Sequence, residues 1–137
     1  MTQSEPFVWK TRIYYRDTDA GGMVFHANYL AFMECARSEL MQARGFDLGE
    51  IARRDRVVFV VHTARITWHK PALLNDAISV TAKLARLSRA RIVFEQAVLR
   101  ESETLAEAEL TIACVNADSH RPVAVPEAVC KAFGEAA

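Results

Sequence analysis

Apolar and polar side chains follow two different periods in the first third of the chain. Between Phe7 and Tyr15 they alternate, with Lys10 and Arg12 on the polar side, and a period of two predicts a half-buried strand. From Tyr29 to Arg44 apolar residues recur every three or four positions, which predicts an amphipathic helix about 24 Å long. Its apolar stripe holds Tyr29, Phe32, Met33, Ala36, Leu40 and Ala43, and Glu34, Arg37 and Gln42 fall largely outside it.

Residues typical of helix ends flank this segment. Asn28 is a plausible N-cap, and Gly45 stands where a left-handed C-terminal cap belongs. Asp47 followed by Glu50 resembles a capping box and predicts a short second helix. Near the end of the chain, Pro126 suits the first position of another short helix.

Alternating patterns continue from Val57 onward and predict four more strands. They cover residues 57–68, 77–87, 89–99 and 105–115. In the first of them Val58, Val60, His62, Ala64, Ile66 and Trp68 share one face, and Pro71 ends the pairing. Short turns favour antiparallel pairing between neighbours. We therefore predict an α+β domain of two layers, in which the long helix covers one face of a curved antiparallel sheet of five strands. Because one helix leaves sheet edges uncovered, we also predict a homo-oligomer.

Composition narrows the functional classes. A length of 137 residues predicts a single domain, 1–137, and 17 basic against 17 acidic residues disfavour nucleic acid as a partner. The longest stretch without charged residues, Ala20–Met33, is shorter than the ~20 apolar residues of a membrane helix. The first residues lack the layout of a signal peptide, and three cysteines without a C-x-x-C pair offer no disulfide framework. We therefore expect a cytoplasmic protein.

The segment between the first strand and the long helix holds most of the candidate chemistry. Asp17, Asp19, Gly21, Gly22 and His26 all precede the helix N-terminus. Unpaired N–H groups at a helix start stabilise an oxyanion, and glycine lets a substrate carbonyl approach the backbone. A carboxylate there can activate water or attack an acyl carbon itself. The alternative is an Asp-Gly turn that binds nothing.

Other kinds of site have weaker support. A calcium loop starting at Asp17 would need a carboxylate at Asn28, and a transition-metal site there would need another ligand from elsewhere. Cys35 lies among apolar neighbours and is typical of a small buried hydrophobe. Two arginine clusters remain, and the second lies at a turn where it can bind phosphates or simply be solvated. The clusters are Arg53, Arg54 and Arg56, and Arg86, Arg89 and Arg91.

A longer motif in this region resembles that of a known family. Residues 13–39 read IYYRDTDAGGMVFHANYLAFMECARSE, which resembles the signature of the 4-hydroxybenzoyl-CoA thioesterase family. Within it the chain most resembles the short acyl-CoA thioesterases associated with the Tol-Pal system. Residues 56–61, the Pro71-x-x-Leu74-x-Asp76 turn and the segment 107–115 fit as well, so the resemblance covers nearly the whole chain.

The resemblance implies a fold, an activity and an assembly. The fold is the hotdog fold, a long central helix wrapped by a curved antiparallel five-stranded sheet. The activity is hydrolysis of an acyl-CoA to the free acid and CoA, with no metal or redox cofactor. The assembly is a dimer or a dimer of dimers (a homotetramer) with the active site between subunits, and acyl carrier protein is a further candidate partner.

The resemblance also implies roles for individual residues. Asp19 matches the catalytic carboxylate, as nucleophile or general base, and Asp17 a position that shapes the loop. His26 stands where related enzymes have a tyrosine whose backbone N–H polarises the thioester carbonyl, and the Tol-Pal branch has histidine there. The expected substrate-binding residues are Gly22, Val24 and Asn28, with Arg89 and Arg91 for the nucleotide of CoA.

Two other functions stay open at this point. One is a non-catalytic scaffold at the cell envelope that binds acyl-CoA or acyl carrier protein. The other is a hotdog dehydratase acting on a hydroxyacyl thioester, although dehydratases pair Asp with His on a motif of different spacing.

Overall fold

The computed structural model describes residues 5–134 and has one open antiparallel sheet with helices. In chain order the elements are β1 (Phe7–Arg12), the 3-10 turn η2 (Tyr15–Asp17), α1 (Asn28–Ala43), α2 (Leu48–Arg54), β2 (Val57–Trp68), β3 (Ala77–Leu87), β4 (Arg91–Arg100), β5 (Glu103–Asn116), β6 (Pro122–Val123) and α3 (Glu127–Gly134). The predicted strands and helices are confirmed. The two-residue strand β6, which pairs with the end of β5, was not predicted.

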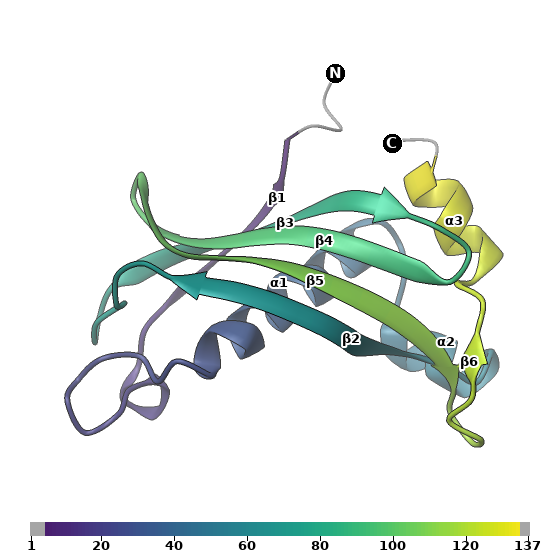
Figure 1. The fold of residues 1–137 in the computed structure, drawn as a ribbon, viewed down its shortest axis with the longest axis horizontal. Coiled ribbons are helices and arrows are strands. Elements are labelled where there is room, and N and C mark those ends of the chain that lie inside the picture. The colour runs from purple at the N-terminus through teal and green to yellow at the C-terminus, as the bar shows by residue number, and fades with distance from the viewer. Residues whose placement is uncertain (1–4, 135–137) are drawn as a thin grey trace.

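The sheet has the order β1-β3-β4-β5-β2, and α1 lies across one of its faces (Figure 1). The predicted two-layer α+β architecture is therefore confirmed. The core forms where the apolar stripe of α1 meets the inward side chains of the sheet, among them Ile78, Val80, Phe94 and Leu110. Tyr29, at the start of the helix, belongs to this core.

Arg37 is buried on α1, although the helical pattern placed it outside the apolar stripe. Its side chain is only 9% exposed, and its Nη1 donates to Oε1 of Gln96 over 2.9 Å. Gln96 in turn donates from Nε2 to the carbonyls of Met33 (3.0 Å) and Thr81 (3.1 Å). Burial lowers the pKa of Arg37. The prediction was wrong because hydropathy treats arginine as polar, whereas its stem packs on apolar surface and its head can bond within the fold.

The two predicted caps of α1 have different outcomes. Gly45 adopts the left-handed conformation with φ of 89°, as expected for a C-terminal cap. Asn28 is not the N-cap: it is the first helical residue, and Ala27 occupies the cap position without a side-chain hydrogen bond. The amide of Asn28 donates instead to the carbonyl of Asp17 over 2.8 Å. At α2 the cap prediction is confirmed, since Asp47 accepts from the N–H of Glu50.

The first strand ends earlier than its alternating pattern. β1 stops at Arg12, and Tyr15 begins a 3-10 turn instead of continuing the strand. The turn forms because the carboxylate of Asp17 accepts the N–H of Tyr14 over 2.8 Å. Side-chain bonding to nearby backbone competes with a strand ladder, and here it redirects the chain toward α1.

The predicted face of β2 is wrong in its first half. Val57, Phe59 and Ile66 pack against the core. The residues that face the core therefore have odd numbers in the first half of the strand and even numbers in the second. The pairing with β5 shifts register between Val61 and Thr63, and one extra residue turns every later side chain to the other face. A constant alternation therefore cannot describe this strand.

The prediction that strands adjacent in the sequence pair with each other is wrong for β2 and β3. β2 pairs with β5 and β3 pairs with β1 and β4, so β2 and β3 are not adjacent. The connection between them, residues 69–76, runs across the end of the sheet and contacts the segment before α1. This connection is therefore part of the structure around the candidate site.

Cys114 provides a test of the core that is independent of function. Its side chain is 1% exposed, and burial, with a smaller contribution from Cys130, raises its pKa from 9.0 to about 11. A thiol with a raised pKa in the folded state favours folding below its unfolded pKa, and this contribution is lost as the pH rises toward 11. We expect urea unfolding at about pH 8.5 and about pH 10 to show a larger loss of stability for wild type than for Cys114→Ala. Equal losses would contradict a buried neutral thiol.

Candidate active site

The segment before α1 is folded back by Asp17 and Asn28. The backbone carbonyl of Asp17 accepts the Asn28 amide over 2.8 Å and the N–H of Phe25 over 3.2 Å. The carboxylate of Asp17 is occupied by the N–H of Tyr14, as described above. The Asn28 side chain and the backbone carbonyl of Asp17 therefore hold the two ends of the loop together, and the Asp17 carboxylate fixes the turn before it.

Asp19 lies exposed at the tip of this loop in a tight turn. Its Oδ1 accepts the N–H of Gly21 over 2.8 Å, and its backbone N–H donates to the carbonyl of Met23 over 2.8 Å. Gly22 has a φ of 81°, the left-handed conformation that glycine adopts without strain. Among residues 5–134, no group donates a hydrogen bond to Oδ2 of Asp19. One carboxylate oxygen is therefore open to solvent or to a ligand.

His26 lies at the start of α1 with its ring exposed. The ring packs edge-on against Trp68 at 5.9 Å and lies 4.4 Å from the ring of Phe25. The indole N–H of Trp68 donates to the carbonyl of His26 over 3.2 Å. The backbone N–H of His26 finds no acceptor in the part of the chain that the structure describes. The positive end of the α1 dipole thus carries a free donor on the same loop as Asp19.

The connection between β2 and β3 packs against the Asp19 loop and forms backbone hydrogen bonds with it. The N–H of Val24 donates to the carbonyl of Ala72 over 3.0 Å, and Met23 forms an isolated bridge with Leu73. The hydroxyl of Tyr29 accepts the N–H of Ala72 over 2.9 Å, which joins the connection to the first turn of α1. The side chain of Val24 is 5% exposed and belongs to the core of the single chain.

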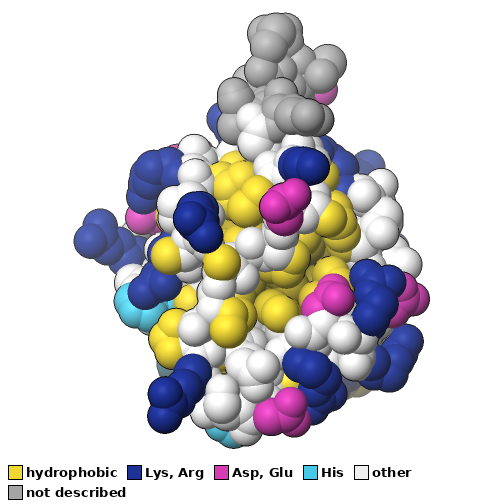
Figure 2. Space-filling view, turned by 90° about the vertical axis from the view of Figure 1, so that its right-hand side faces the viewer, with side chains coloured by type: hydrophobic (Ala, Val, Ile, Leu, Met, Phe, Trp, Pro, Cys, Tyr) yellow, Lys and Arg dark blue, Asp and Glu magenta, His cyan; other side chains and the backbone are white. Residues whose placement is uncertain are grey.

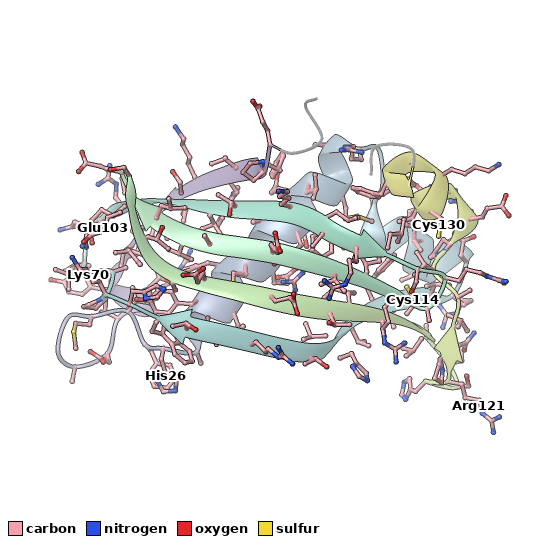
Figure 3. All side chains as sticks on the ribbon, turned by 45° about the horizontal axis from the view of Figure 1, so that its top comes forward. His26, Lys70, Glu103, Cys114, Arg121 and Cys130 are labelled. Carbon is pink, nitrogen blue, oxygen red and sulfur yellow. The ribbon has the colours of Figure 1, made fainter. Side chains whose placement is uncertain are left out.

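Arg89 and Arg91 lie at the other end of the sheet from Asp19. Arg91 pairs with Ala113, which pairs with Val60 of β2, whereas Trp68 lies eight residues further along that strand. At 3.3 Å per residue this is about 26 Å. Figure 3 shows the same division, with His26 at one end and Arg121 at the other. A single chain therefore does not bring the two arginines to the loop of Asp19.

The end that carries the two arginines has an amphipathic surface. The turn between β3 and β4 contacts the segment before α3, where the N–H of Val125 donates to the carbonyl of Arg89 over 2.8 Å. Figure 2 shows this end of the molecule: hydrophobic side chains gather at its centre, and Lys and Arg side chains lie around them. Such a surface places positively charged side chains next to apolar side chains.

Comparison with known proteins assigns the chain to a family. Residues 14–133 match the family described as the Thioesterase-like superfamily. The chain belongs to this superfamily. Membership agrees with the resemblance of residues 13–39, and the hotdog fold that it implied is confirmed by the structure.

Individual members of the superfamily are similar over almost the whole chain. The chain is 38% identical to "Acyl-CoA thioesterase YbgC" of Haemophilus influenzae, over 93% of each protein. It is 35% identical to "Acyl-CoA thioester hydrolase YbgC" of Escherichia coli, over 93% of this chain and 95% of the relative. A crystal structure of a probable thioesterase from Bartonella henselae superimposes with a TM-score of 0.84 at 31% identity, over 88% of this chain and 99% of the other.

Sequence reasoning missed some residues that build the site in this member of the superfamily. Trp68 was assigned only to a strand face, and Tyr29 only to the apolar stripe. The signal that points to the supporting connection is the Pro71-x-x-Leu74-x-Asp76 pattern, which interrupts the alternation of the strands. No pattern in the chain predicts that Tyr29 accepts from Ala72, because this bond joins residues 43 positions apart.

The described residues offer neither a metal-binding cluster nor a membrane-spanning helix. Within residues 5–134, no group of three or more His, Cys, Asp or Glu side chains is placed to hold a metal ion. No helix among these residues is long and apolar enough to cross a membrane.

Proposed function

We propose that this protein is an acyl-CoA thioesterase that hydrolyses the thioester to a carboxylic acid and CoA. The observation that carries the proposal is the loop before α1, which presents an exposed carboxylate oxygen of Asp19 together with the free N–H of His26. Thioester hydrolysis needs both a group that delivers the nucleophile and donors for the oxyanion. The printed names of the Haemophilus and Escherichia relatives support the same substrate class.

The proposed mechanism assigns each group one task. The thioester carbonyl oxygen accepts from the N–H of His26 and lies at the positive end of α1, where negative charge is stabilised. Asp19 attacks the acyl carbon, or takes a proton from a water molecule that attacks it. The C–S bond then breaks and CoA leaves as a thiolate. Where water attacked, this step gives the free acid directly. Where Asp19 attacked, it gives an acyl–Asp19 anhydride, which a water molecule then hydrolyses to the free acid and the restored carboxylate. Because a thiol has a pKa of about 8.5, the leaving group needs no strong general acid.

A substrate panel tests the proposal directly. Purified protein is incubated with acyl-CoAs bearing aromatic, short aliphatic and long aliphatic acyl groups, and released thiol is measured with a chromogenic disulfide. We expect thiol release with at least one of these groups. A scaffold that only binds acyl-CoA releases no thiol, and a dehydratase converts a hydroxyacyl thioester without releasing thiol. Either result would overturn the proposal.

The proposal includes a second copy of the chain. β2 is an edge strand of 12 residues, paired with β5 on one side, and exposes Val60 and Val61. Antiparallel pairing of two such strands about a twofold axis places the start of one beside the end of the other. The arginine-bearing end of one subunit then approaches the Asp19 end of its partner. A dimer, or a dimer of two such dimers, therefore accounts for the distance between the two predicted parts of the site.

Location and partners complete the proposal. We place the enzyme in the cytoplasm, since Cys35, Cys114 and Cys130 are all free thiols. The resemblance of residues 13–39 to the Tol-Pal-associated branch makes a role near the cell envelope part of the proposal. Acyl carrier protein is a second candidate carrier of the acyl group.

Arg89 and Arg91 are expected to bind the phosphates of CoA. Replacing both by Ala should raise KM for an acyl-CoA with little change in kcat, because phosphate contacts bind substrate and transition state alike. KM for the corresponding acyl-pantetheine, which lacks the nucleotide, should hardly change. Lys131→Ala, which removes an exposed cation of α3, is the matched control. Equal losses on both substrates would show that the arginines support the fold instead.

A further inference from the structure

The connection between β2 and β3 is attached to the Asp19 loop through backbone hydrogen bonds. In addition to the bond from Val24 to Ala72, the N–H of Leu74 donates to the carbonyl of Gly22 over 3.3 Å. Met23, which bridges to Leu73, accepts the N–H of Asp19. A shift of residues 72–74 therefore changes the backbone that carries Asp19.

Asp76 gives this connection its shape. Its Oδ2 accepts the N–H of Leu73 over 2.8 Å, and its own N–H donates to the carbonyl of Leu73 over 3.0 Å. Its carbonyl accepts the N–H of Ile13 over 2.9 Å, which ties the turn to the end of β1. Asn75 between them has a φ of 75°, a left-handed conformation that a residue with a side chain adopts at a cost. The turn is therefore held by specific bonds rather than by backbone preference.

Arg100, the last residue of β4, contacts both ends of the connection. Its Nη1 donates to Oδ2 of Asp76 over 2.7 Å and to the carbonyl of Pro71 over 3.3 Å. Its Nη2 donates to Oε1 of Glu103 over 2.8 Å, and Glu103 also accepts from Lys70. Hydrogen bonds to Glu103 and then Asp76 raise the pKa of Arg100, so the guanidinium is charged at every physiological pH. Figure 3 shows Lys70 and Glu103 at the same end of the molecule as His26.

We propose that Arg100 is a positioning residue for Asp19. It acts through residues 71–76 of the connection. The guanidinium binds Asp76 and Pro71, and Asp76 binds the N–H of Leu73. Leu73 and Ala72 in turn contact Met23 and Val24, and Met23 accepts the N–H of Asp19, so the position of the connection fixes the position of Asp19. Arg100 itself bonds to Pro71, Asp76 and Glu103 and not to Asp19. The inference rests on the proposed function, in which Asp19 is the catalytic carboxylate.

The expected effect of losing Arg100 is on geometry more than on global stability. Ion pairs at a partly solvated surface contribute little to the free energy of folding. Small displacements of a catalytic group, by contrast, cost large factors in rate, up to about 10²-fold for 1 Å. Displacement of Asp19 should therefore appear in kcat before it appears in the melting temperature.

Arg100→Met is the principal test. It should lower kcat about tenfold with a smaller change in KM, because the Asp19 loop is displaced while Arg89 and Arg91 at the other end of the sheet are not. Arg100→Lys should restore part of kcat, since an ammonium can still reach Asp76. Arg54→Met is the matched control: it removes an exposed arginine whose ion pair with Glu50 on α2 does not contact the connection, and kcat should stay at the wild-type value. If Arg54→Met lowers kcat as much as Arg100→Met, the proposal is wrong.

A double-mutant cycle tests the route through Asp76. Asp76→Asn should lower kcat by a similar factor, and the variant with both changes should be no worse than either single variant. Additive losses would show that Arg100 acts by a path that does not include Asp76 and would overturn the proposal as stated.

Amide hydrogen exchange separates this inference from the proposed activity. In Arg100→Met the amides of Asp19, Val24 and Leu74 should exchange faster than in wild type, whereas the amide of Ile112 in β5 should not. This readout needs no substrate, so it remains valid if wild type releases no thiol from any acyl-CoA. Unchanged exchange at these three amides, or equally faster exchange at Ile112, would refute the positioning role.

Discussion

Asp19→Asn is expected to lower kcat for acyl-CoA hydrolysis by at least about 10²-fold, the scale of a lost acid or base group. The fold should be unaffected, because the amide oxygen of Asn can accept the same N–H of Gly21 and the side chain is exposed. What Asn lacks is the negative charge that, in the proposed mechanism, attacks the acyl carbon or takes the proton from water. Steady-state kinetics with thiol detection measure the loss in kcat. Circular dichroism and melting curves check that the fold is unchanged.

Asp17→Asn is the natural control for that result. Its carboxylate accepts the N–H of Tyr14, a bond that an Asn oxygen can also make, and its bonds to Phe25 and Asn28 come from its backbone. The loss in kcat should therefore be much smaller than for Asp19→Asn. His26→Ala should be intermediate, because the backbone N–H survives while the contact with Trp68 is lost. If Asp17→Asn is the more damaging change, the catalytic role belongs to the other aspartate.

The features that could be predicted from the sequence are those with local causes. The helical spacing of α1, the left-handed cap at Gly45 and the cap at Asp47 depend on residues close together in the chain, and all three are present. The loop of Asp19 belongs to the same class, since the N–H groups of Gly21, Gly22 and Met23 close its turn through bonds to Asp19 that span four residues at most.

The features that could not be predicted depend on residues far apart in the chain. The register shift after Val61 is defined by the pairing of β2 with β5, about 50 residues later. Arg37 is buried because Gln96 of β4 offers an acceptor, and Asn28 leaves its cap position because Asp17 offers a carbonyl. In each case a tertiary partner outweighs a local preference.

The exposed edge of β2 leads to the second large effect that we expect, loss of the proposed dimer. Val61 is 49% exposed on a strand that pairs on one side only, and beside it α1 and α2 line a groove with Met41 and Leu48. A long unpaired strand edge with exposed valines is covered in most proteins, and a lysine on it opposes pairing because its charge has to be buried.

Val61→Lys should therefore raise the dissociation constant of the dimer at least about 10²-fold, as measured by sedimentation velocity over a range of concentrations. KM for acyl-CoA should rise with it, because in the proposed dimer Arg89 and Arg91 reach the site of Asp19 from the second subunit. Val8→Lys is the matched control: Val8 is 44% exposed on β1, the opposite edge of the same sheet. That variant should remain a dimer with wild-type kinetics. A dimeric Val61→Lys, or dissociation by Val8→Lys, would show that the subunits meet at another surface.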